Sequence, residues 1–167
     1  AYASQTDRSV APRLIVELAK PSQSVAGARY AVAQAAYNTG LSDLEVAATA
    51  AREADRALEL RPGWDRAALM KADILAKTSP EGAIRYLNSF LASAPESRAA
   101  TGALAQLYIE QKRLGEARGL FQRLLDDDPS DRDIQFAVAA ISVQMKDYAA
   151  AERTFECRRA RELDRWE

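Results

Sequence analysis

The sequence repeats itself with a period of about 34 residues, and this restricts the fold more than any other feature of the chain. Three consecutive windows of this length can be aligned, at residues 64–97, 98–131 and 132–165. Their twentieth residue is always alanine, at Ala83, Ala117 and Ala151. Four residues later a large apolar residue follows, at Leu87, Phe121 and Phe155. A period of this kind is typical of a chain that stacks one small structural unit several times.

The spacing indicates that each unit is a pair of helices. Two helices approach closely only where a small side chain lies between them, and a bulky side chain one turn later fills the next layer. Pro95 and Pro129 occupy equivalent positions of the first two windows, where proline would end a helix. No segment alternates apolar and polar residues convincingly over the length of a strand. We therefore expect an all-α fold.

Polar residues mark where helices are expected to begin. Ser79 precedes Pro80, which combines an N-cap residue with a favourable first helical residue. Residues 130–133 supply a second start of this kind, because they begin with Ser and Asp. Residues 42–45 read Ser-Asp-Leu-Glu, the pattern of a capping box, and predict that a further helix begins near Leu44.

The window at residues 98–131 matches a known consensus. Its key residues are Leu104, Ala105, Tyr108, Ala117, Phe121 and Pro129. They stand where the pattern W-x2-L-G-x2-Y…A-x3-F…P expects Leu, Gly, Tyr, Ala, Phe and Pro. The chain thus resembles tetratricopeptide-repeat proteins over most of its length. The resemblance implies a solenoid, a right-handed superhelical stack of antiparallel helix pairs.

On this basis we predict a single tetratricopeptide-repeat domain over residues 1–167. Its expected parts are a partial preceding repeat at 1–23, then repeats at 24–63, 64–97, 98–131 and 132–165. The repeat at 24–63 is longer than standard, and Leu14, Val16 and Leu18 would be the remnant of an earlier helix. The last repeat is atypical, because Arg158 replaces the expected small residue and no proline follows. It is interpreted as a capping helix or as the point where a longer array is cut.

Composition excludes several classes of function. The net charge is −1, which gives no long-range attraction to nucleic acid. The chain has no histidine, so the usual general base and the commonest metal ligand are missing. We predict no enzymatic activity, no cofactor and no metal site, and interpret the acidic run 126–128 as a solvated helix end. The single Cys157 leaves the redox compartment open, and no apolar run is long enough to span a membrane.

The family resemblance also suggests where a partner would bind. In tetratricopeptide-repeat proteins, positions 2, 5, 9, 12 and 13 of each repeat line a concave groove. The predicted lining residues here are Val32, Asp65, Ala68, Ala72, Leu75, Gln106, Ile109, Glu110, Phe136, Ala140 and Val143. Most are small or apolar, and they lack the basic groups with which some family members hold an acidic C-terminal tail. The predicted ligand is an apolar helix or an extended segment with hydrophobic anchors.

Two functions follow as alternatives. The first is a protein-interaction scaffold that binds a protein or peptide partner in this groove. The second is a structural or self-oligomerising module, in which neighbouring repeats or a second copy of the chain fill the groove. The sequence identifies neither the partner nor the oligomeric state.

Three segments, residues 62–72, 108–113 and 143–148, further resemble a group of bacterial tetratricopeptide-repeat proteins. Several members of that group are lipid-anchored and exported, and some are adaptors that present substrates to carboxy-terminal processing proteases. The resemblance implies an adaptor in a bacterial envelope or protease complex. It also implies a periplasmic or outer-membrane-anchored location, with the cytoplasm as the alternative.

Overall fold

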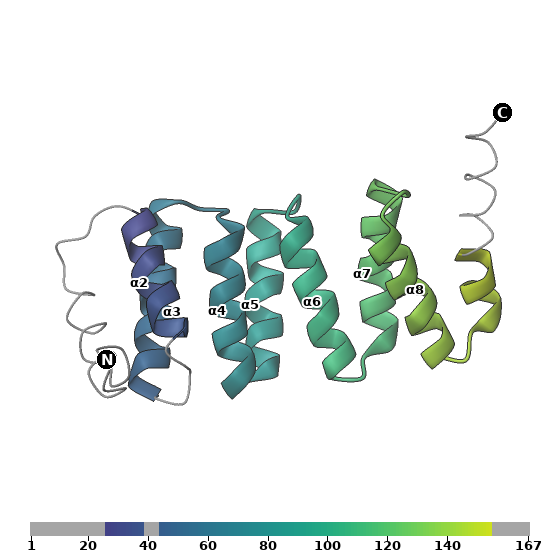
Figure 1. Ribbon diagram of the computed structural model, residues 1–167, viewed down its shortest axis with the longest axis horizontal. Coiled ribbons are helices and arrows are strands. Elements are labelled where there is room, and N and C mark those ends of the chain that lie inside the picture. The colour runs from purple at the N-terminus through teal and green to yellow at the C-terminus, as the bar shows by residue number, and fades with distance from the viewer. Residues whose placement is uncertain (1–25, 39–43, 155–167) are drawn as a thin grey trace, which may run out of the picture. The chain divides into compact units, whose positions relative to one another are not determined.

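The computed structural model describes residues 26–38 and 44–154, which are almost entirely helical (Figure 1). The helices are α2 (Ala26–Asn38), α3 (Leu44–Leu60), α4 (Asp65–Thr78), α5 (Pro80–Ser93), α6 (Arg98–Glu110), α7 (Leu114–Asp127) and α8 (Arg132–Gln144). Residues 148–154 are also helical. The described residues contain no strand, so the predicted all-α class is confirmed.

The chain divides into two compact units, Ala1–Ser97 and Arg98–Glu167, which are described separately. Unit 1 contains α2 to α5, and unit 2 contains α6 to α8 and the helix at 148–154. Each aligned window begins close to the first residue of a helix, at Asp65, Arg98 and Arg132. The single domain over residues 1–167 stays a prediction.

Alanine dominates the packing of unit 1. Helix α2 packs against α3 and lies directly against α4, and α4 in turn packs against α3 and α5. Ala33, Ala36, Ala50 and Ala54 are all fully buried. Such short side chains let helix axes approach closely, and Val46 and Met70 fill the remaining space in the same cluster.

Unit 1 also buries an ion pair. Glu53 on α3 is 1% exposed, and its Oε2 accepts a hydrogen bond of 2.9 Å from Nη1 of Arg29 on α2. Arg56, one turn further along α3, binds the other carboxylate oxygen of Glu53. A buried charge is tolerated only when it is paired and hydrogen-bonded, so these contacts tie α2 to α3.

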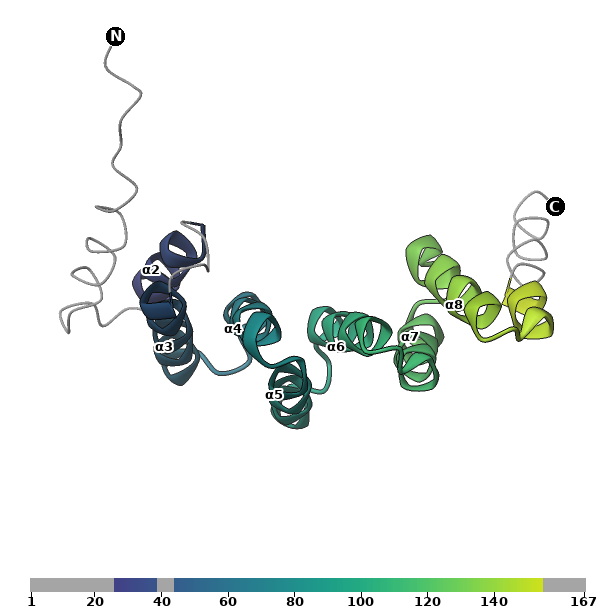
Figure 2. The same cartoon turned by 90° about the horizontal axis from the view of Figure 1, so that it is seen from below.

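Unit 2 has a core built around α7, the middle one of its three labelled helices in Figure 2. Helix α7 packs against α6 on one side and α8 on the other. The core consists of Ala105, Ala117, Phe121, Leu124, Val138 and Ile141. The packing expected of the repeat is confirmed in both units, since Ala83, Leu87 and Ala117 are fully buried and Phe121 is 7% exposed. Phe155 lies outside the described residues.

The predicted helix starts are observed at two points. The Ser79 Oγ accepts a hydrogen bond of 3.1 Å from the Gly82 N–H at the start of α5. The Asp131 carboxylate accepts from the N–H groups of Asp133 and Ile134 at the start of α8. Helix α3 begins at Leu44, but Ser42 and Asp43 of the expected capping box lie outside the described residues.

The same turn follows α6 and α8. Lys112 and Lys146 have positive φ angles of 58° and 61°. The N–H of the next residue reaches back to the helix, from Arg113 to Tyr108 and from Asp147 to Ser142, each at 2.8 Å. This is the hydrogen-bond pattern of a Schellman motif, in which a left-handed residue satisfies the last helical carbonyls. The two repeats of unit 2 therefore make their first turn in the same way.

Candidate functional site

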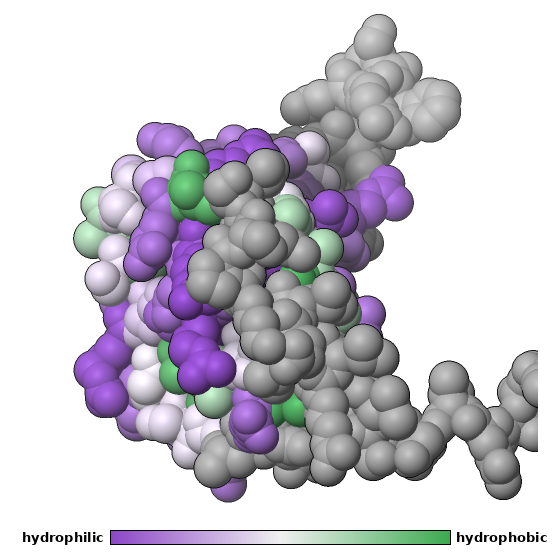
Figure 3. Space-filling model, turned by 90° about the vertical axis from the view of Figure 1, so that its left-hand side faces the viewer, coloured by the Kyte–Doolittle hydropathy of each residue, from purple (hydrophilic) through white to green (hydrophobic). Residues whose placement is uncertain are grey.

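The structure places the predicted groove residues of unit 1 mostly in the interior. Val32, Ala68 and Ala72 are 7%, 0% and 2% exposed. Asp65 and Leu75 are partly exposed, and the Asp65 carboxylate accepts a hydrogen bond of 2.6 Å from Ser97 Oγ. Because Ala72 is covered by the chain itself, a substitution there would test packing rather than ligand binding. Figure 3, seen from the α2 and α3 end, shows a described surface that is mainly hydrophilic or near neutral.

In unit 2 the corresponding residues are accessible. Phe136 and Val143 on α8 are 68% and 49% exposed. Ala140 lies between them and is partly exposed, as is Ile109 on α6, whereas Gln106 and Glu110 are exposed. We call these six residues, Gln106, Ile109, Glu110, Phe136, Ala140 and Val143, the α6–α8 face.

Helical geometry explains why the α8 residues of this face share one side of the helix. Phe136, Ala140 and Val143 are spaced by four and three residues, which places them on one side of the helix. The seven residue steps from Phe136 to Val143 span about 10 Å along the axis. Helices α6 and α8 run in the same direction in Figure 1, and both pack on α7. Ile109 packs against the core of unit 2, so it anchors the α6 side of this face.

Two further exposed apolar residues of unit 2 were missed by the sequence reasoning. Met145 and Tyr148 are 38% and 61% exposed, and they follow α8 directly in the chain. Met145 lies in the turn after α8, and Tyr148 begins the next helix. Neither residue is at one of the groove positions that the family pattern assigns to the first helix of a repeat. Gln144, Lys146 and Asp147 interrupt the apolar residues of this segment, so the sequence offered no clear signal for them.

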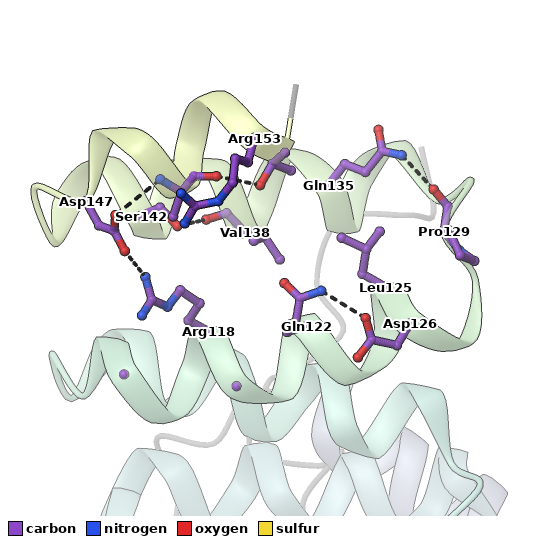
Figure 4. Close-up of a pocket in the computed structure, with 14 residues that line it drawn as sticks. Arg118, Gln122, Leu125, Asp126, Pro129, Gln135, Val138, Ser142, Asp147 and Arg153 are labelled. Carbon is purple, nitrogen blue, oxygen red and sulfur yellow. Dashed lines mark hydrogen bonds and ion pairs between the residues drawn. The ribbon is translucent and has the colours of Figure 1, made fainter. Parts of the chain in front are cut away.

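A cavity of ≈640 Å³ lies elsewhere in unit 2, between α7, α8 and the helix at 148–154 (Figure 4). Gly115 and Gly119 of α7 line it, and a Cβ atom added at either would meet nothing within 4 Å. Arg118 crosses the cavity edge and donates a hydrogen bond of 2.7 Å to Asp147. The pKa of the Asp147 carboxyl is held below its ordinary value mainly by this hydrogen bond, and also by a second one from the Ala150 N–H. The glycine pair was the sequence signal for this cavity, and the sequence reasoning did not use it.

Most polar groups that line the cavity bind one another. The Gln122 Nε2 donates to Asp126 Oδ1 at 2.9 Å, and the Gln135 Nε2 donates to the Pro129 carbonyl at 2.7 Å. The Gln135 Oε1 atom is buried without a hydrogen-bond partner among the described residues. In Figure 4 this oxygen points away from the centre of the cavity. The lining is therefore largely self-satisfied and presents no converging set of free polar groups.

A smaller cavity of ≈430 Å³ lies in unit 1 between α3 and α5. Tyr86 lines it, and its hydroxyl is buried without a hydrogen-bond partner in the described part of the chain. The pKa of the Tyr86 hydroxyl is raised above its ordinary value, mainly by burial and also by the negative charge of Asp55. The Lys71 Nζ lies 4.5 Å from the centre of the Tyr86 ring and also binds Asp55. These contacts are typical of structural packing between helices.

Acidic side chains form no metal-binding cluster in the described part of the chain. Residues 26–38 and 44–154 contain no group of three or more His, Cys, Asp or Glu residues placed to hold a metal ion. The acidic run ends α7 as expected, since the helix stops at Asp127 and Asp128 accepts hydrogen bonds from the Ser130 N–H and Oγ. Within the same ranges, no helix combines the length and the apolar character that crossing a membrane requires. Cys157 and Trp166 lie outside the described residues.

Comparison with known proteins agrees with this architecture. Residues 75–141 match the family model of the tetratricopeptide repeat. No curated protein sequence matches the chain. Residues 75–141 therefore carry tetratricopeptide-repeat sequence, and the described helices have the fold of that class.

Solved structures show the same fold. MamA from Desulfovibrio magneticus RS-1 is 23% identical with a TM-score of 0.64, and the match covers 97% of this chain and 88% of that one. TTC0263, a thermophilic tetratricopeptide-repeat protein of Thermus thermophilus, is 21% identical with a TM-score of 0.61, covering 81% and 73%. YrrB, described as a tetratricopeptide-repeat protein with an unusual peptide-binding site, is 16% identical with a TM-score of 0.61, covering 90% and 75%.

Proposed function

We propose that this protein is an interaction scaffold that binds a partner polypeptide on the α6–α8 face of unit 2. The observation that carries the proposal is the exposure of Phe136 and Val143 on one side of α8, at 68% and 49%. Single exposed apolar residues are common on protein surfaces. Two large ones on one side of a helix, separated by the partly exposed Ala140, form an apolar patch of the kind found at binding sites.

The composition of the face suits a peptide better than a small molecule. Burying a Phe or Val side chain stabilises a complex by about 1.5–3 kcal/mol each. Aromatic residues near the centre of an interface contribute a large share of the binding energy. Ala140, between the two large side chains, leaves room for a ligand side chain to approach the helix. The peptide-binding site described for YrrB shows that a protein of this fold can hold a peptide.

The proposal has a narrower form, an adaptor in a bacterial envelope or protease complex. It rests on the resemblance of residues 62–72, 108–113 and 143–148 to that group of proteins. In this form the bound partner would be a carboxy-terminal processing protease or one of its substrates. If affinity capture identifies a partner of another kind, the adaptor role is wrong, whereas the interaction-scaffold function still stands.

Self-association is the second candidate, because the same exposed Phe136 and Tyr148 could be covered by another copy of the chain. Light scattering over a range of concentrations separates the two functions. A stable oligomer that the Phe136→Ser variant converts to monomer supports self-association. A monomer that retains a partner supports the scaffold.

The proposed partner site is tested by affinity capture with three proteins, wild type, Phe136→Ser and Leu60→Ser. Leu60 is 53% exposed in unit 1, so its substitution removes a similar apolar surface away from the proposed site. We expect Phe136→Ser to lose the partner that wild type and Leu60→Ser both retain, with helix content unchanged by circular dichroism. Equal capture by all three proteins would contradict the proposal.

A further inference from the structure

We infer that the partner segment of the α6–α8 face carries basic side chains on both sides of its apolar anchors; this inference rests on the proposed function. The carboxylates that would meet these basic groups are Glu110 at the end of α6 and Asp133 near the start of α8. Both residues are exposed. The predicted lining positions of the two helices contain no lysine or arginine.

No ion pair joins Glu110 or Asp133 to another residue of the described ranges, although Asp65, Asp131 and Asp147 are all engaged by side chains. Glu110 is the last residue of α6, where the helix dipole already places partial negative charge. The last turns of α6 and α8 contain no basic residue, and Lys112 and Lys146 follow in the turns without binding Glu110. An incoming cation would therefore be favoured at this end of the face.

The positions of the carboxylates relative to the apolar residues indicate where the ligand carries its basic groups. Helices α6 and α8 run in the same direction and have 13 residues each. Asp133 lies one turn before Phe136 on α8, whereas Glu110 is the last residue of α6. Because the two helices run in the same direction, these carboxylates stand at opposite ends of the face, Asp133 before the apolar residues of α8 and Glu110 at the C-terminal end of α6. The matching segment has basic residues that bracket its apolar anchors.

The inference is tested by selecting peptides from a random phage-displayed library on wild-type protein, after removing those that bind the Phe136→Ser variant. Phe136-dependent peptides with apolar residues between lysines or arginines are the expected result. Phe136-dependent peptides that are neutral or acidic would overturn this inference and leave the proposed function standing. If no selected peptide depends on Phe136, the proposed peptide-binding function fails, and this inference fails with it.

A charge variant tests the assigned carboxylates directly. For a selected basic peptide, fluorescence anisotropy should give a Kd that is about 3- to 10-fold weaker with Glu110→Gln plus Asp133→Asn at low salt. The difference should shrink as ionic strength rises, because exposed charges are screened. Glu96→Gln, an exposed carboxylate of unit 1, should leave the Kd unchanged. Equal effects of the two sets of substitutions would show that general charge, and not these two residues, selects the peptide.

Discussion

Units 1 and 2 place the same repeat positions in opposite environments. Ala68 and Ala72 hold positions 5 and 9 of the repeat in α4, and both are buried. Phe136 and Ala140 hold these positions in α8, where Phe136 is 68% exposed and Ala140 is partly exposed. The difference follows from the neighbouring helix, since α2 lies directly against α4 but α6 makes no such direct approach to α8. A repeat position fixes the direction of a side chain, and the distance to the next helix decides whether it is buried.

The units also differ in what holds their helices together. Unit 1 ties α2 to α3 with the buried Arg29 and Glu53 pair, inside a layer of small alanines. Unit 2 has an apolar core around Phe121 and leaves a large cavity beside Gly115 and Gly119. Unit 1 thus buries the repeat positions of α4, whereas unit 2 combines an accessible apolar face with the larger of the two cavities described above.

The largest expected effect comes from breaking the buried ion pair of unit 1. Glu53→Gln should lower the free energy of unfolding by about 3–5 kcal/mol, because it leaves Arg29 buried beside a neutral group. Urea denaturation followed by circular dichroism measures the loss. Glu59→Gln, an exposed carboxylate on the same helix, is the control and should change stability by less than about 0.5 kcal/mol. Equal losses for Glu53→Gln and the control would mean that the pair does not stabilise unit 1.

A matched pair of substitutions tests the contrast between α4 and α8. Ala72→Leu should cost about 1–3 kcal/mol, because extra methylene groups do not fit a closed packing. Ala140→Leu, at the same repeat position in α8, should change stability by within about 0.5 kcal/mol. Thermal melting of the two variants provides the comparison. A larger loss for Ala140→Leu would reverse the assignment of closed and accessible faces.

A smaller effect, of opposite sign, is expected at the cavity of unit 2. Gly119→Ala should raise the free energy of unfolding by about 0.5–1 kcal/mol, since alanine favours the helix and its Cβ meets no atom within 4 Å. Gly82→Ala is the matched control in unit 1. There the added Cβ would lie 2.9 Å from Ser79 Oγ, so loss of the helix cap should cancel the gain. Stabilisation of both variants by the same amount would argue against this account.

The smallest effect concerns pH. The pKa of Asp147 is lowered in the folded protein, so its contribution to stability is present above the ordinary value of 3.8. The contribution is lost as the pH falls through the lowered folded-state pKa. Asp147→Asn should therefore reduce the melting temperature slightly near neutral pH and make no difference in strong acid. Arg118→Gln should remove the same contribution, and a difference between wild type and Asp147→Asn that persists in strong acid would exclude the ion pair as its cause.

Much of the fold was predictable because it depends on local chemistry. Ala117 and Phe121 follow from the repeat, and Ser79 and Asp131 mark helix starts through their own side chains. The buried Glu53 was not predicted, since a charged residue within a helix is ordinarily read as exposed. The burial of Ala72 was not predicted either, because it depends on how closely a second helix approaches. The groove residues identified by family position therefore reach the surface in one unit and the interior in the other.

The turns at Lys112 and Lys146 carry a consequence for how such a chain could change in length. Both turns close with the same pair of backbone hydrogen bonds and the same left-handed residue, one period apart. Duplication or deletion of one whole period between them would join identical geometries, so the junction itself would need no redesign. Because the backbone has the same geometry at these two lysines, the repeats of unit 2 are interchangeable at these turns, even though their exposed side chains differ.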